Sequence, residues 1–107
     1  MLGDSLLVNG SSEAPITLVL AHGSDAPMDS HFMNTVAEAI GGTDVRVVRF
    51  EFPYMTARRK SGKRYAPDRE PVLIESWRSL IAKLGSVAGL VIGGKSLGGR
   101  IAGMIAD

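Results

Sequence analysis

The stretch Val91-Ile92-Gly93-Gly94-Lys95-Ser96-Leu97-Gly98-Gly99-Arg100 decides the fold. It begins with a short apolar run, passes through glycines to a serine, and continues into Ile101–Ala106, which is typical of a helix with small residues on one side. Residues 94–98 match the pattern G-x-S-x-G of a nucleophile elbow, a sharp turn between a strand and a helix with the serine exposed at its tip. A Cβ at either flanking glycine would strike the neighbouring strand or helix in so tight a turn.

The same residues also match a second pattern, the phosphate-binding P-loop G-x-x-x-x-G-K-[ST], over Gly89–Ser96. In a P-loop the four spacer residues coil around a phosphate. Here residues 90–93 are Leu-Val-Ile-Gly, and the first three are the best strand formers nearby. The preceding strand would then have to come from Lys83–Ala88, which is typical of a helix end and a turn. We therefore favour the elbow and keep the P-loop, and a glycine-rich turn with an incidental serine, as alternatives.

Composition and charge limit the classes of site. The chain of 107 residues is long enough for one small domain, and its net charge of +1, from 12 basic and 11 acidic residues, gives no reason to expect nucleic-acid binding. There is no cysteine, and two histidines, His22 and His31, are too few for a zinc site. No apolar run is as long as a membrane span, and the start of the chain lacks a secretory-signal pattern. We expect a cytoplasmic protein that binds no metal, cofactor, nucleic acid or membrane.

Strand and helix patterns alternate along the chain. Strands are expected at Ser5–Gly10 (an edge strand), Ile16–Ala21, Val45–Phe52 and Leu90–Ile92. One helix is expected from a cap at Asp29 or Ser30, with a stripe of Met28, Phe32, Met33, Val36 and Ile40, and another from Pro71 to Gly85, with a stripe of Leu73, Trp77, Leu80, Ile81 and Leu84. This order predicts an α/β fold with an open parallel sheet between helices, a three-layer α/β/α sandwich.

The segment from Tyr54 to Arg69 has no periodicity, and we expect a solvated loop. The alternative is a basic rim that attracts an anionic substrate or a protein partner. The segment contains half of the basic residues: Arg58, Arg59, Lys60, Lys63, Arg64 and Arg69.

The candidate site lies beyond the carboxyl ends of the strands, where α/β sheets bind ligands. His22-Gly23-Ser24 follows one strand and Ser96 follows another. A serine that attacks an acyl group needs N–H groups that stabilise the oxyanion, and in the elbow fold these come from the residue after the serine and from the loop after an earlier strand. The N–H groups of Leu97 and Ser24 are the candidates. Gly23 lets the backbone turn inward, and His22 orients the loop. We expect His22, Gly23 and Lys95 to be the substrate-binding residues.

The same chemistry needs a base and a carboxylate that orients it, and in this fold both follow the serine in the chain. Both histidines precede Ser96, and Asp107 is too close to it in sequence to serve. The sequence therefore predicts a nucleophile and an oxyanion hole without a base.

Four stretches of the sequence resemble one known family: Leu18–Ser24, Arg49–Met55, Pro67–Pro71 and Gly93–Arg100. They are similar to the dienelactone-hydrolase-like α/β-hydrolase family, which includes testis-expressed protein 30 and a subunit of the NSL chromatin complex. The resemblance extends from about Pro15 to the end of the chain, but covers only the first half of that family's domain. It implies an α/β-hydrolase fold truncated after the elbow helix, with residues 1–107 as the N-terminal half of one domain.

The resemblance also implies a serine hydrolase that acts on an ester or related acyl bond of a small molecule. Ser96 would be the nucleophile, the backbone N–H groups of Ser24 and Leu97 would form the oxyanion hole, and this chain would be catalytically incomplete. Because one branch of the family acts as a scaffold, a non-enzymatic interaction module with Arg58–Arg69 as its contact surface is the alternative. A P-loop nucleotide binder is the third hypothesis.

Overall fold

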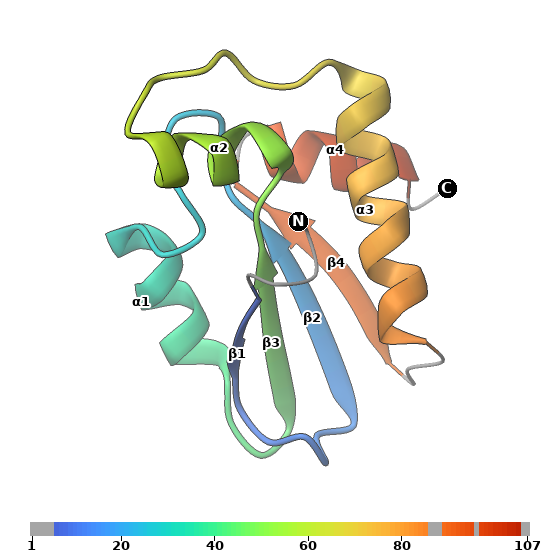
Figure 1. Ribbon diagram of the computed structural model, residues 1–107. Helices are drawn as coiled ribbons and strands as arrows, with labels where there is room; N and C mark the ends of the chain where they lie inside the picture. Colours follow the sequence, from blue (N-terminus) through green and yellow to red (C-terminus); the bar gives the residue numbers. More distant parts are fainter. Residues whose placement is uncertain (1–5, 86–88, 96, 106–107) are drawn as a thin grey trace.

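Four strands form one sheet at the centre of the molecule (Figure 1). The computed structural model describes residues 6–85, 89–95 and 97–105. The strand order is β1-β3-β2-β4, with bounds β1 (Leu7–Asn9), β2 (Ile16–Ala21), β3 (Val45–Phe50) and β4 (Leu90–Gly94). β2 pairs in parallel with both β3 and β4, whereas β1 pairs antiparallel with β3. The predicted edge strand and the parallel arrangement of the other three strands are confirmed.

Helices lie on both faces of this sheet, as the predicted three-layer α/β/α sandwich requires. They are α1 (His31–Ile40), α2 (Pro53–Ser61), α3 (Glu70–Leu84) and α4 (Leu97–Ile105). Figure 1 shows α1 beside one face, α3 and α4 beside the other, and α2 across the carboxyl ends of the parallel strands. Successive side chains of a strand point to opposite faces, so Val48 packs in the core with α3 and α4 while the buried Val47 points to the other face. No described helix has both the length and the apolarity to cross a membrane.

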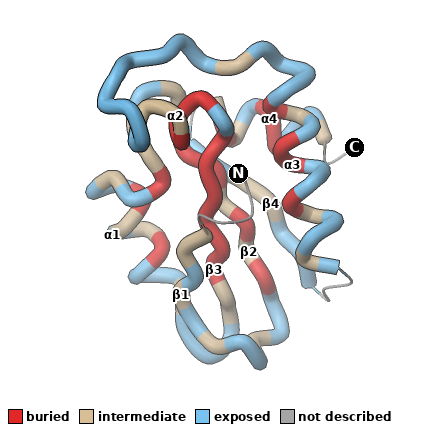
Figure 2. Tube along the Cα trace, in the orientation of Figure 1, coloured by how far each residue is buried: buried red, intermediate tan, exposed pale blue. Residues whose placement is uncertain are grey.

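The core is concentrated near the ends of the strands that lead into the candidate site (Figure 2). Burial increases along β3, whose last four residues are all buried. Trp77 of α3 is fully buried, and its ring lies edge-on to Phe50, with 4.8 Å between the ring centroids. Phe50 makes a similar contact with Phe52 at 5.4 Å. The predicted role of Trp77 as a core anchor is confirmed, and it gives the carboxyl end of the sheet a rigid base.

The start of α1 agrees with the prediction, but its apolar stripe was partly wrong. Ser30 caps the helix, and its Oγ accepts a hydrogen bond from Met33 N–H at 3.3 Å. Met33 and Ala37 are buried, whereas Phe32 and Ile40 are 48% and 41% exposed. The helix begins only at His31. Residues 33 and 37, which are one helical turn apart, therefore form the face that is turned toward the sheet.

The prediction of a loop over Tyr54–Arg69 was wrong, because α2 occupies its first half, and the strand predicted to reach Phe52 ends at Phe50. Pro53 begins α2 rather than closing the strand, since its fixed φ suits the first helical turn. Gly62, with φ 75°, ends the helix, and its N–H donates to Arg58 O at 2.8 Å. Only the N-terminal residues Tyr54, Met55 and Thr56 are buried, so the sequence carries no apolar stripe that would have revealed the helix.

Candidate active site

The connection from β4 to α4 has the order that an elbow requires. β4 ends at Gly94 and α4 begins at Leu97. Lys95 N–H donates to Ala21 O at 3.1 Å, which fastens the turn to the end of β2. Ser96 itself lies outside the described residues. An elbow is expected to hold its serine at positive φ and close to the N–H of the loop after the neighbouring strand, here Ser24, and both expectations concern this residue. The P-loop prediction was wrong, since residues 90–93 form a strand and do not coil around an anion site.

The two glycines of the G-x-S-x-G pattern are sterically required. A Cβ on Gly94 would lie 2.7 Å from Ala21 O and 2.8 Å from the carbonyl carbon of Gly98. A Cβ on Gly98 would lie 2.5 Å from His22 O and 2.7 Å from Ala21 Cβ. These contacts confirm that a side chain at either position would strike the neighbouring strand or helix.

A cavity of about 530 Å³ lies between the elbow and the loop after β2. It brings together the two predicted oxyanion donors, Ser24 from that loop and Leu97 from the first turn of α4. Within residues 6–85, 89–95 and 97–105, no acceptor takes a hydrogen bond from Ser24 N–H. The full lining is Ser24, Pro67, Asp68, Glu70, Leu73, Leu97 and Arg100.

His22 is fully buried and does not belong to the lining of this cavity. Phe52 N–H donates to His22 Nε2 at 3.1 Å, so Nε2 is unprotonated, and Nδ1 carries the proton and donates to Gly23 O at 2.5 Å. Burial lowers the pKa of His22, which keeps the ring neutral. With both ring nitrogens engaged, His22 holds the loop and is not the base. His31 is exposed on the first turn of α1.

Tyr54 fixes the next part of the loop. Its hydroxyl donates to Ser24 O at 2.9 Å, and its backbone N–H donates to Asp68 Oδ2 at 2.9 Å. Burial raises the pKa of Tyr54 to about 12, so the hydroxyl keeps its proton and remains a donor. One residue of α2 thus ties the Ser24 loop to Asp68 on the opposite side of the cavity.

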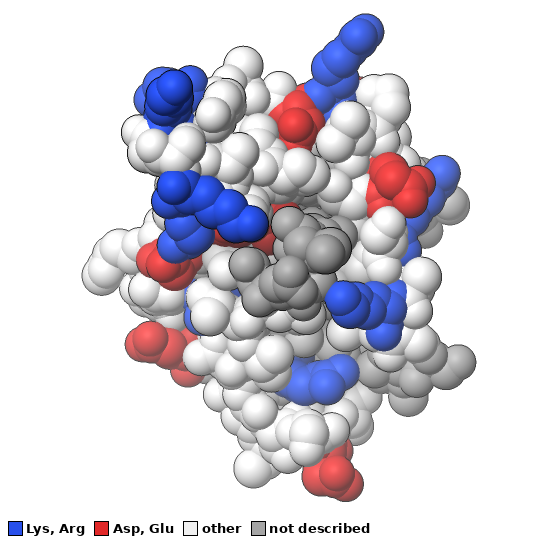
Figure 3. All heavy atoms as spheres, in the orientation of Figure 1, with Lys and Arg blue, Asp and Glu red and all other residues white. Residues whose placement is uncertain are grey.

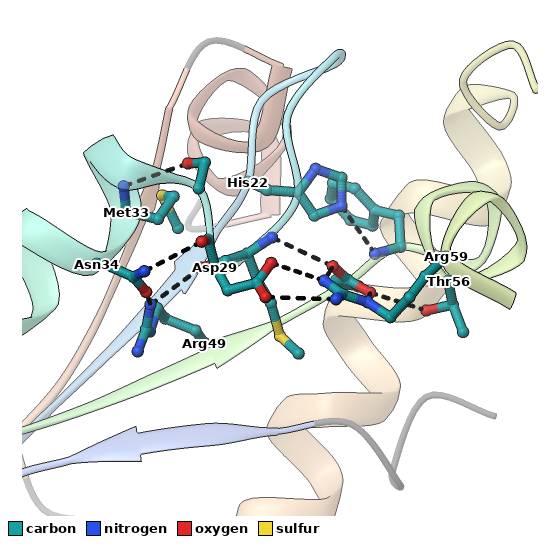
Figure 4. A network of polar contacts seen from close by, with 11 residues as sticks. His22, Asp29, Met33, Asn34, Arg49, Thr56 and Arg59 are labelled. Atoms are coloured by element: carbon teal, nitrogen blue, oxygen red, sulfur yellow. Dashed lines mark hydrogen bonds and ion pairs between the residues drawn. The ribbon is translucent and has the colours of Figure 1, made fainter. Parts of the chain in front are cut away.

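A buried carboxylate holds the far end of the same loop, within a network of polar contacts that also includes Asp29 and Arg59 (Figure 4). Glu51 is 1% exposed, and its Oε2 accepts hydrogen bonds from Met28 N–H at 3.2 Å and from Arg59 Nη2 at 2.5 Å. Arg59 also bonds Asp29 Oδ1 at 2.8 Å, and this hydrogen bond lowers the pKa of Asp29. Hydrogen bonds to Glu51 and then to Asp29 raise the pKa of Arg59. The network closes the loop between β2 and α1 against α2.

Sequence reasoning missed Glu51, Tyr54, Arg59 and Asp68. Glu51 was assigned to a strand, and the other three fell in the expected loop. Their partners lie 5 to 31 residues away along the chain and on different elements, so no pattern within one element could have paired them.

The charges of the basic rim, the alternative for this segment, are partly neutralised. Arg64 pairs with Asp25 at 2.8 Å, Arg58 lies 3.7 Å from the same carboxylate, and Arg59 is held by Glu51 and Asp29. Figure 3 shows basic side chains dispersed over the face it presents, with acidic ones among them, rather than one continuous patch. A partner that binds through Arg58–Arg69 stays a prediction.

The cavity rim carries charges of both signs, and Arg100 Nη1 lies 3.6 Å from Glu70 Oε2. Both side chains are about half exposed, at 59% and 49%. Lys95, the remaining predicted substrate-binding residue, places its Nζ over the Phe32 ring, 4.7 Å from the centroid. In the part of the chain that the structure describes, no group of three or more histidine or acidic side chains could hold a metal ion.

The chain matches a known protein family. A family model described as an alpha/beta hydrolase domain matches residues 14–107, a span that includes β2, β3, β4 and all four described helices. No curated protein and no solved structure matches the chain.

Proposed function

The chain belongs to the alpha/beta hydrolase domain family, and from this premise we propose that it carries the nucleophile and the oxyanion hole of a serine hydrolase. Its substrate would be a small molecule with an ester or related acyl bond. The observation that carries the proposal is the cavity that Ser24 and Leu97 line together, directly beside the G-x-S-x-G turn. The closer assignment to the dienelactone-hydrolase-like branch belongs to the same proposal and rests on the four sequence stretches that resemble it.

In the proposed reaction, Ser96 Oγ attacks the acyl carbon and expels the leaving alcohol, which leaves the acyl group on the serine. The negative charge of the tetrahedral intermediate develops on the former carbonyl oxygen, between the N–H groups of Ser24 and Leu97. Loss of one such donor costs about 10²- to 10³-fold in kcat. Leu97 also contributes the positive end of the α4 dipole, because it is the first residue of that helix.

We further propose that residues 1–107 by themselves are catalytically incomplete. His22 is engaged at both ring nitrogens, and no histidine follows Ser96 in the sequence. Without a base, turnover should fall by about 10⁶-fold relative to a complete triad and leave a residual of about 10³ over water from binding and the oxyanion hole.

The test is acylation of Ser96 by the activated ester p-nitrophenyl acetate, followed by intact-mass spectrometry and peptide mapping. We expect slow transfer of one acetyl group to Ser96, no labelling at that position in Ser96→Ala, and unchanged labelling in the control Ser79→Ala on the exposed side of α3. Preferential acetylation elsewhere would contradict the assignment of Ser96 and favour a non-enzymatic interaction module. Rapid multiple turnover that Ser96→Ala abolishes would contradict the claim that the chain lacks a base.

A further inference from the structure

The peptide group between Gly23 and Ser24 determines where the Ser24 N–H points. No described peptide bond is cis. In a planar trans peptide the C=O and the N–H point in opposite directions. Whatever fixes the Gly23 carbonyl therefore also fixes the direction of the Ser24 N–H.

The Gly23 carbonyl is held on the buried side of the loop. It accepts a hydrogen bond from His22 Nδ1 at 2.5 Å, and the Tyr54 hydroxyl lies 3.5 Å from it and 2.9 Å from Ser24 O. Gly23 and His22 are buried, whereas Ser24 lines the cavity. The opposite end of the peptide, the Ser24 N–H, meets no acceptor within the described residues.

We propose that His22 and Tyr54 are positioning residues that hold the Gly23–Ser24 peptide so that the Ser24 N–H points into the cavity. His22 does so by donating from Nδ1 to the Gly23 carbonyl. Tyr54 does so by donating its single hydroxyl proton to the Ser24 carbonyl at 2.9 Å, with the Gly23 carbonyl 3.5 Å away. The inference rests on the proposed function, since it assigns these residues to the oxyanion hole. A hydrogen bond to the carbonyl also polarises the peptide and strengthens its N–H as a donor.

The tautomer of His22 is set from the other side of the ring. Phe52 is the N-cap residue of α2, and its N–H donates to Nε2. A proton on Nε2 would face this N–H and would leave the Gly23 carbonyl without its donor. The groups that act on the ring charge are Glu51, which favours protonation, and Arg58 and Arg59, which oppose it. One imidazole thus joins the start of α2 to the oxyanion loop.

Two substitutions distinguish the role of the Nδ1 donor of His22 from the role of its Nε2 acceptor. His22→Asn keeps an N–H₂ donor near the position of Nδ1 and loses the acceptor for Phe52 N–H, whereas His22→Gln keeps an acceptor near Nε2 and loses the donor to Gly23 O. Tyr54→Phe removes only the hydroxyl and keeps the ring, whose centroid lies 5.8 Å from that of His22. His31→Gln is the matched control on an exposed histidine.

The experiment combines two NMR measurements with the acetylation rate of Ser96 by p-nitrophenyl acetate. Long-range ¹⁵N spectra should show the His22 proton on Nδ1. The N–H residual dipolar coupling of Ser24 should change in His22→Gln and Tyr54→Phe, and stay near the wild-type value in His22→Asn and His31→Gln. Acetylation should slow by about 10²-fold in His22→Gln, as for loss of one oxyanion donor, with most of the rate recovered in His22→Asn.

A proton on Nε2, or a Ser24 coupling that His22→Gln leaves unchanged, would overturn the proposal. If His22→Gln does not fold, as amide spectra and thermal melts would show, the tautomer and Tyr54→Phe decide the question. Absence of Ser96 acetylation in the unaltered chain would count against the proposed function alone, because the tautomer and the Ser24 coupling test the positioning without any reaction.

Discussion

Replacing Gly98 by alanine adds a methyl group where α4 crosses the end of β2. The new Cβ would lie 2.5 Å from His22 O, 2.7 Å from Ala21 Cβ and 2.8 Å from Ala21 O. Two of these atoms are backbone and the third is a methyl group attached directly to the strand. None can rotate away, so α4 has to move relative to β2.

The magnitude follows from two opposing effects. Overpacking of a closed site costs about 1–3 kcal/mol, and three contacts shorter than 3.0 Å place Gly98→Ala near the upper end. Alanine is favoured over glycine in a helix by about 1 kcal/mol. The expected net loss in the free energy of unfolding is about 2 kcal/mol, which for a domain of this size corresponds to a Tm lower by about 8–16 °C.

Gly103→Ala is the matched control, since it makes the same change in the same helix, and no described atom outside the helix's own nearby backbone lies within 4 Å of the new Cβ. It should stabilise the chain by up to about 1 kcal/mol through helix propensity alone. Urea titration followed by circular dichroism measures both variants. A Gly98→Ala variant as stable as Gly103→Ala would refute the steric account of the elbow, and equal losses in both would refute the argument that the contact with β2 matters.

Two further predictions concern the loop after β2. Glu51→Gln should lower the free energy of unfolding by about 3 kcal/mol, the lower end of the range of about 3–5 kcal/mol for a broken buried pair, because Arg59 is 40% exposed and can be rehydrated. The control Glu75→Gln, exposed on α3, should stay within about 0.5 kcal/mol by the same urea titration, and similar losses in both would contradict a special role of Glu51. Burial lowers the pKa of His22 below its ordinary value of 6.5, so below that pH the unfolded chain binds more protons than the folded chain. The contribution of the neutral His22 to the free energy of unfolding should therefore be fully present above pH 6.5. It should fall as the pH drops toward 5, by at most about 1.4 kcal/mol per pH unit. His22→Asn should flatten this dependence, and a wild-type stability that stays constant or rises from pH 7 to pH 5 would contradict the buried neutral ring.

Elements with strong local patterns could be predicted from the sequence. The continuous β-branched and apolar run Ile16–Ala21 is β2 to the residue, and the stripe of Leu73, Trp77 and Leu80 is the buried face of α3. The need for Gly94 and Gly98 between β4 and α4 was predictable because the whole G-x-S-x-G pattern lies within five residues of sequence, and the steric need for glycine arises in the turn itself.

α2 could not be predicted, since only its first turn is buried and the rest is a solvated basic helix. Its existence depends on Pro53 and Gly62 at its ends and on the core that receives Tyr54 and Met55. A helix shows a periodic apolar pattern only where one of its faces is packed against the core along its whole length. Because α2 lies across the end of the sheet, only its first turn packs against the core (Figure 1).

For the candidate site, the sequence alone was enough to propose which groups react: Ser96 in an elbow, and the N–H groups of Leu97 and Ser24 beyond the ends of parallel strands. Only the tertiary structure decided what holds them. Met28 and Glu51 are 23 residues apart in the chain, and His22 and Phe52 are 30 apart, yet each pair shares a hydrogen bond. Turn geometry depends on neighbouring residues and can be inferred from the sequence, whereas a hydrogen bond between distant residues forms only after the strands have aligned their ends at one edge.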